Sequence, residues 1–279
     1  MRRTILRPAE LAGTGLHTGA AVRVRLEPAA AGAGLRFFRS DRASMAEIPA
    51  SLEAVDGTER RTALAAEGAR VETVEHLLAA VAAAGIDDLR VLVDGPDLPI
   101  VDGSFAPYCA LLDRGGIREV SGRRHVWVVD APFEVQEGEA SYQVGPAPAC
   151  RLEALLEHAE PVIGHQRAAY ASDGEAFASA IAPARTYGFL AEVQALQARG
   201  LLAGASAAVA IVLSPTAPLN TTLRWPEEFA RHKVGDLLGD LALLGGPLRG
   251  AVRARRPSHR GNIACARAIA ARARLVEEE

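Results

Sequence analysis

The stretch FARHKVGDLLGD, residues 229–240, places three titratable side chains at helical spacing. His232, Asp236 and Asp240 follow one another at intervals of four residues, and positions four apart lie on one face of an α-helix. An imidazole nitrogen and a carboxylate oxygen on one such face can bind the same metal ion. Phe229 and the leucines around it indicate that part of this face is buried, where unpartnered charge is costly. The spacing alone favours a solvent-exposed ion pair of His232 with Asp236, and the partly buried face raises the alternative hypothesis that both are metal ligands.

A second candidate site is the pair Glu75-His76, which stands near the start of a predicted helix. A catalytic zinc site uses three protein ligands and keeps one position open for water, so the helical pair needs a third ligand from elsewhere. His76 can supply it, and Glu75 can then act as the general base for a water held by the ion. The alternative is that Glu75 only stabilises the positive end of a helix and His76 lies on the surface.

His259 is the third candidate, in the stretch RPSHRGN, residues 256–262, which we expect to be a loop before a helix. Loops held by rigid elements often carry catalytic groups. A charged imidazole there could protonate a leaving amine, and Asp240 could orient it. An exposed loop histidine is the alternative. The remaining histidines outside the first loop have no carboxylate partner at helical spacing and are interpreted as structural or surface residues: His125, His158 and His165.

Lys233 lies between the two predicted ligands and is the only lysine among 31 strongly basic residues. The scarcity of lysine fits a composition rich in alanine, arginine and glycine. A retained lysine can mark a functional position or arise by chance.

The elements that must position these residues can be predicted from periodicity. Alternating Val and Leu with Arg predicts a half-buried strand at 21–28. A helix is predicted over 70–85, capped by Thr73 and ended by Gly85. The other expected elements are strands near 34–40, 87–94, 125–135, 140–145, 150–157, 207–215 and 250–255, and helices at 107–116, 173–181, 188–200, 225–246 and 263–275.

The two halves of the chain repeat one order of elements, although their residue identity is slight. In each half, strands precede a helix that carries a histidine beside charged residues, and a glycine, a strand, a polar loop and a closing helix follow. This order predicts a duplicated α+β unit with two helices on one face of a sheet. We expect the boundary in the polar stretch 119–130, which divides the chain into domains 1–121 and 122–279.

Composition excludes several classes of protein. The net charge of −3 and the absence of clustered excess base argue against nucleic-acid binding. Three scattered cysteines without CxxC spacing argue against a disulfide framework. No secretory signal and no uninterrupted 18-residue apolar run is recognised. We therefore expect a cytoplasmic protein without stable membrane insertion, and a monomer.

Several stretches together resemble one family. GTGLHTG, TVEHLLAAVAAAGIDDL, PIVDGSFAP, ARTYGF, EFARHKVGDLLGDL and His259 match, in order and spacing, the UDP-3-O-acyl-N-acetylglucosamine deacetylases of lipid A biosynthesis. The resemblance extends from about residue 3 to residue 272. It implies a zinc amidase of two α+β domains packed as a β-α-α-β sandwich, with an inserted helix and strand in the second domain. Its implied substrate is UDP-3-O-acyl-N-acetylglucosamine, from which it releases acetate in a Gram-negative bacterium.

The resemblance also implies a role for each matching residue. The implied zinc ligands are His76, His232 and Asp236. The implied catalytic residues are Glu75 as general base, His259 as general acid, Asp240 as the acid that orients His259, and Thr186 as a donor to the oxyanion. Implied substrate contacts are Lys233, Tyr187 and Gly204, with residues 189–204 lining a channel for the acyl chain. Iron(II) also suits a site of two histidines and one carboxylate.

The sequence departs from the family pattern in places that concern the substrate. HAEPVIGHQR replaces a usual His-Pro start at 158–167, GASAAVAIV at 204–212 lacks an acidic residue, and Arg61 stands where some members have cysteine. None of these changes removes a ligand or an acid-base residue. Two alternatives stay open here: a related zinc amidase acting on another acylated amine, and a non-catalytic binding protein for nucleotide sugars or lipid intermediates.

Overall fold

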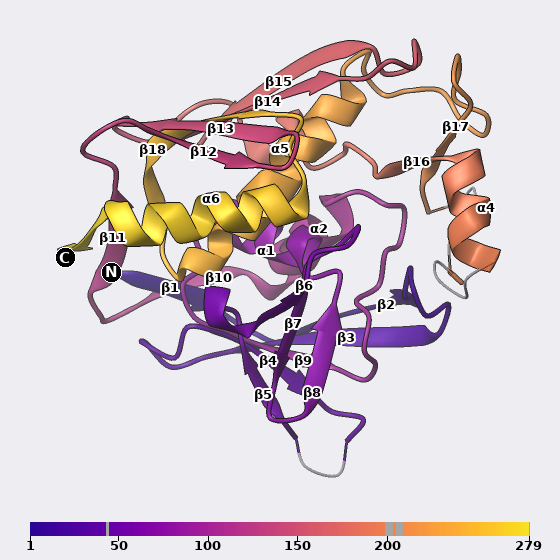
Figure 1. The fold of residues 1–279 in the computed structure, drawn as a ribbon. Helices are drawn as coiled ribbons and strands as arrows, with labels where there is room; N and C mark the ends of the chain where they lie inside the picture. The colour runs from indigo at the N-terminus through magenta and orange to yellow at the C-terminus, as the bar shows by residue number, and fades with distance from the viewer. Residues whose placement is uncertain (43–44, 199–202, 205–208, 279) are drawn as a thin grey trace.

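The computed structural model describes residues 1–42, 45–198, 203–204 and 209–278 and has an α+β fold. Helices lie between an upper and a lower sheet (Figure 1). The α-helices of the described residues are α1 (Glu75–Ala83), α2 (Ala106–Gly115), α3 (Phe177–Ala180), α4 (Leu190–Ala198), α5 (Glu228–Leu241) and α6 (His259–Arg272). None of them is long and apolar enough to cross a membrane.

The lower sheet is built by the first half of the chain. Its strand order is β2 (Ala9–Thr14), β3 (Ala21–Pro28), β9 (Leu89–Val93), β4 (Leu35–Arg39) and β5 (Glu47–Pro49). Strand β3 confirms the prediction from alternation, because its valines and leucine are buried and its arginines face outward. Smaller units adjoin this sheet: β6 (Val55–Gly57), β7 (Ala63–Ala66) and β8 (Ala69–Glu72) form one, and β1 (Arg2–Ile5) pairs with β10 (Ile117–Val120).

The upper sheet is built by the second half of the chain. Its main path contains β12 (Phe133–Glu137), β13 (Ala140–Gly145), β18 (Leu248–Arg255), β11 (Arg124–Val128) and β19 (Arg274–Glu278), and β18 also pairs with β14 (Cys150–Glu157), which pairs with β15 (His165–Ala171). A separate parallel pair joins β16 (Tyr187–Phe189) to β17 (Ile211–Leu213) beside α4, at the right of Figure 1. Each large sheet thus comes from one half of the chain, while the boundary at residue 121 stays a prediction.

Two helices, α1 and α5, meet in the middle of the molecule and bring the halves together. Their approach depends on Gly239 of α5. A Cβ atom built there would lie 2.1 Å from the carbonyl oxygen of Glu75 in α1. Gly235, one turn earlier, leaves room for the Phe105 ring in the same way. The close packing places the first turn of α1 against the last turn of α5.

Replacing Gly239 with alanine is expected to destabilise the fold by about 2 kcal/mol, within the range typical of overpacked cores. Alanine favours a helix over glycine by about 1 kcal/mol, but here the clash is with main chain, which cannot rotate away. Denaturant unfolding of the two proteins measures the difference. Gly145→Ala is the control, since a Cβ there meets nothing within 4 Å. Equal stability of Gly239→Ala and the parent protein would contradict this account.

Several predicted boundaries were wrong, among them the starts of α1 and α6. Residues 69–72 form β8 rather than helix, because they pair with β7, and sheet pairing outweighs local helix propensity there. Thr73 does not cap α1: it has a φ of 59°, and its hydroxyl donates to Asp97 Oδ1 at 2.6 Å. His259 is the first residue of α6 rather than part of a loop, because Ser258 caps this helix by accepting a hydrogen bond from the N–H of Gly261.

Candidate metal centre and active site

Three buried side chains converge where α1 meets α5. His76 is the second residue of α1, and His232 and Asp236 lie one turn apart on α5. One donor atom from each lies within 4.8 Å of the others. Asp236 Oδ1 is 3.4 Å from His232 Nε2 and 3.8 Å from His76 Nε2. The three predicted ligands are therefore together, one from the first half of the chain and two from the second.

The chemical state of these side chains fits a divalent ion. Burial lowers the pKa of His76 to about 3 and also lowers that of His232, so both imidazoles are neutral, as metal ligands must be. His232 Nδ1 lies 3.1 Å from the carbonyl oxygen of Ala184, which accepts its hydrogen and leaves Nε2 free for a ligand bond.

Asp236, the third ligand, has a buried oxygen that no described residue satisfies. Burial alone would raise the pKa of Asp236, but positive charge beside it, of which Lys233 at 2.8 Å is the lasting source, holds the pKa well below its usual range, so the side chain is a carboxylate. Its Oδ1 is buried and has no hydrogen-bond partner among the described residues, which is expensive unless an ion binds there. Two neutral imidazoles and one carboxylate suit zinc, and they equally suit iron(II).

Glu75 lies beside this cluster as the first residue of α1 and is almost fully buried. Its Oε2 accepts a hydrogen bond from the N–H of Thr62 at 3.0 Å, and its Oε1 is 3.8 Å from His259 Nε2. Burial raises the pKa of Glu75 to about 7 against the opposing charge of His259. A carboxylate with this pKa can take up a proton near neutral pH.

The His259 ring contacts Asp240 through one nitrogen and faces Glu75 with the other. Its Nδ1 lies 2.9 Å from Asp240 Oδ2. Burial alone would lower the pKa of His259, but Asp240 and Glu75 outweigh it and raise the value to about 9. The imidazole is therefore charged at neutral pH, while the neighbouring Glu75 can be ionised. Such a pair of groups in opposite proton states is typical of acid-base catalysis.

Two residues of this network were missed in the sequence. The Thr62 hydroxyl donates to Asp240 Oδ1 at 2.5 Å, and the Asn262 amide donates to Asp240 Oδ2 at 2.8 Å. Asn262 stands three residues after His259 on one helix, a spacing that could have indicated a shared face. Thr62 lies 178 residues from Asp240 in the chain, and no local signal connects them.

The remaining predicted residues lie at different distances from the cluster. Lys233 donates from Nζ to Asp236 Oδ2 at 2.8 Å and lies 5.9 Å from the centre of the Tyr187 ring. That ring is 6.5 Å from the His232 ring. Thr186 is held through its main chain, with its N–H donating to the oxygen of Gly103 at 2.7 Å.

Gly204 is separate from these contacts, because its N–H donates to Leu16 O in the first turn-rich loop. The described part of the predicted acyl channel is Phe189, helix α4 and residues 203–204, of which α4 is a helix as expected. Residues 199–202 of that channel, and residues 205–208 of the divergent stretch, lie outside the described residues.

An open cleft of about 650 Å³ leads to Lys233 and Tyr187. Among the described residues, three arginines and four glutamates also line it, the arginines being Arg60, Arg256 and Arg260. Each of these arginines forms an ion pair with a glutamate of the same cleft: Glu192, Glu139 and Glu137 respectively. A larger hollow of about 930 Å³ lies on the upper sheet, but none of the predicted site residues lines it.

Known proteins that resemble this chain in sequence share one name. Residues 2–271 match the family model described as UDP-3-O-acyl N-acetylglycosamine deacetylase. The chain is 41% identical over 259 residues to the UDP-3-O-acyl-N-acetylglucosamine deacetylase of Myxococcus xanthus (strain DK1622), covering 92% of this chain and 82% of that protein. It is 42% identical over 274 residues to the enzyme of the same name from Phenylobacterium zucineum (strain HLK1), covering 97% and 94%. The enzyme of that name from Thermosynechococcus vestitus is 41% identical over 269 residues, covering 96% and 94%.

Proposed function

The chain belongs to the UDP-3-O-acyl N-acetylglycosamine deacetylase family, and we propose that it hydrolyses the acetamide of UDP-3-O-acyl-N-acetylglucosamine at the cluster of His76, His232 and Asp236. The reaction releases acetate and the free amine and belongs to lipid A biosynthesis. The observation that carries the assignment is the position of Glu75 and His259, 3.8 Å apart beside the three ligands. A protein that only binds its ligand has no need of a base and a charged acid at that place.

The chain's own residues divide the chemistry between them. A zinc ion held by the two histidines and Asp236 would polarise the acetyl carbonyl and lower the pKa of water. Glu75 takes a proton from the attacking water. His259, charged through Asp240, stabilises the negative charge that develops and then protonates the departing amine. The Thr186 hydroxyl donates to the developing oxyanion.

Residues other than Glu75 and His259 are proposed to hold the substrate. Lys233 adds positive charge beside the metal ligands, and the cleft that it lines is the proposed place of the nucleotide sugar. Tyr187 offers a flat ring for the sugar, and Gly204 and the described part of 189–204 are proposed to lie along the acyl chain. The three cysteines are free, which supports a reducing cytoplasm as the place of action.

Acetate release tests the function. Purified protein is expected to release acetate from UDP-3-O-acyl-N-acetylglucosamine, to lose this activity on chelation and to regain it when zinc is added. Iron(II) added under anaerobic conditions identifies which ion supports the faster reaction. Protein that binds zinc tightly but releases no acetate would contradict the substrate assignment. Protein that neither binds metal nor responds to chelation would contradict the metal site.

Replacing Asp240 with asparagine is expected to move the alkaline limb of the kcat–pH profile to lower pH. His259 must be charged to act as an acid, so activity falls as the pH rises through its pKa. The Asp240 carboxylate raises that pKa, and its loss lowers the pH at which the proton leaves. Steady-state kinetics between pH 5 and pH 10 measure the shift, which is about one unit for each 1.4 kcal/mol of interaction lost. An alkaline limb at the parent's pH would show that Asp240 does not act through His259.

A further inference from the structure

The segment before Thr186 is tied to α5 by a buried ion pair that no catalytic role explains. Glu228, the first residue of α5, is fully buried. Its Oε1 accepts hydrogen bonds from the main-chain N–H and the Nε of Arg185, at 3.1 and 2.8 Å. Its Oε2 accepts from Arg185 Nη2 at 3.1 Å and from the N–H of Arg224 at 2.6 Å. Burial alone would raise the pKa of Glu228, but these donors hold it below its ordinary value, so the buried group is a carboxylate.

The ion pair lies one helical turn from the predicted ligand His232. Glu228 and His232 are four residues apart and therefore lie one above the other on one helix face. Both contact the same peptide group, between Ala184 and Arg185. The N–H of Arg185 donates to Glu228, and the carbonyl of Ala184 accepts from His232 Nδ1 at 3.1 Å. Since a trans peptide is planar, with its N–H and C=O on opposite sides, fixing one group fixes the direction of the other.

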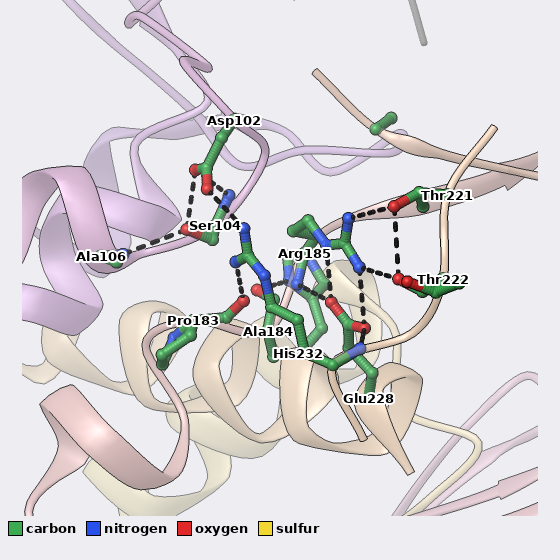
Figure 2. Close-up of polar contacts among 12 residues, drawn as sticks. Asp102, Ser104, Ala106, Pro183, Ala184, Arg185, Thr221, Thr222, Glu228 and His232 are labelled. Atoms are coloured by element: carbon green, nitrogen blue, oxygen red, sulfur yellow. Dashed lines mark hydrogen bonds and ion pairs between the residues drawn. The ribbon is translucent and has the colours of Figure 1, made fainter. Parts of the chain in front are cut away.

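A second layer of contacts holds the guanidinium itself. Arg185 Nη1 donates to the Thr221 hydroxyl at 3.0 Å, and Nη2 donates to the Thr222 carbonyl at 2.9 Å. Figure 2 shows Arg185 between Glu228 and these two threonines, with Ala184 and His232 directly beside it. The Arg185 side chain is thus anchored on two sides, and it cannot turn without breaking the contacts of Glu228.

We propose that Arg185 and Glu228 are positioning residues that aim the Ala184 carbonyl at His232 Nδ1 and so hold His232 Nε2 toward the metal. This inference rests on the proposed function, in which His232 is a ligand. Partners that orient a ligating histidine in this way commonly change metal affinity by about 10–100-fold when they are replaced. Neither residue touches substrate or metal in this account, and each acts only through His232.

Zinc affinity, measured by competition with a chromophoric chelator on folded metal-free protein, tests the proposal. Arg185→Lys and Glu228→Gln are expected to weaken zinc binding by about 10–100-fold. Glu228→Asp is a milder variant that keeps the charge and withdraws it by one methylene, and we expect a smaller loss in the same direction. Circular dichroism identifies the variants that fold, and only those are compared.

The chain offers a closely matched control in Arg2 and Asp88. This pair is also doubly hydrogen-bonded, at 2.7 and 2.8 Å, and its side-chain exposure of 12% and 0% nearly equals the 13% and 0% of Arg185 and Glu228. Arg2→Lys is expected to lower thermal stability while leaving zinc affinity unchanged. Equal zinc affinity in Arg185→Lys, Glu228→Asp and the parent would overturn the proposal, as would an equal loss of affinity in Arg2→Lys.

His232→Ala, measured in the same series, separates this inference from the proposed function. If His232→Ala keeps the parent's zinc affinity, the metal site itself is wrongly assigned and the proposal fails with it. If His232→Ala loses affinity while the folded Arg185 and Glu228 variants do not, only the positioning role fails. Cobalt(II)-substituted protein adds a readout of geometry, because its visible absorption is expected to change in Arg185→Lys and to stay the same in Arg2→Lys.

Discussion

Replacing Glu75 with alanine is expected to lower kcat by about 10²–10⁴-fold, the range typical of a lost general base, while the protein keeps its metal. Glu75 is the carboxylate nearest to His259 Nε2 and stands next to the ligand His76 in the chain. Its raised pKa of about 7 suits proton uptake from water at neutral pH. Steady-state acetate release and metal analysis of the same preparation measure both quantities.

Glu75→Gln separates the proton transfer from the structural contact. Glutamine keeps an oxygen that can accept the hydrogen bond from the N–H of Thr62, but it cannot take up a proton. We expect the same fall in kcat as for alanine, with better retained stability. Turnover near the parent's rate in either variant would show that another group acts as the base.

Replacing His76 with alanine is expected to remove zinc binding at micromolar concentrations and, with it, acetate release. The substitution takes away one of three protein ligands, so its effect should exceed the 10–100-fold typical of a residue that only orients a ligand. It also leaves Asp236 Oδ1 with one fewer neighbour in a buried place. Metal content after dialysis and chelator competition measure the loss.

His125→Ala is the control for this substitution, because His125 lies exposed on β11. Its zinc content and kcat are expected to equal those of the parent protein. Zinc held by His76→Ala with the parent's affinity would mean that the ion binds elsewhere. The Glu75 and His76 variants then differ in kind, since the first loses catalysis with metal bound and the second loses the metal.

Spacing within single elements predicts which candidate residues lie near one another, while the resemblance to the deacetylase family supplied their roles. His232 and Asp236 share a helix, and an α-helix rises 5.4 Å per turn whatever surrounds it. Glu75 and His76 are neighbours in the chain, so one being near the ion brings the other near it. These two relations depend only on local backbone geometry, so they can be predicted from the sequence.

The role of Asp240 needed more than spacing. By helical position it could bind the ion beside Asp236 or contact another group. The resemblance to the deacetylase family pointed to His259, and the contact of 2.9 Å agrees. Thr62 and Asn262 complete the shell around Asp240, and only folding brings Thr62 there from the other half of the chain.

The sequence by itself determined the alternating strands, the α+β order and the residues able to bind zinc or transfer protons, because each depends on residue type and on repeats of two or 3.6 residues. Tertiary structure alone decided where α1 begins, how closely α1 meets α5 at Gly239, and which carbonyl orients His232. Those features depend on pairing and packing between segments far apart in the chain. Their energies come from contacts that no local pattern of residues encodes.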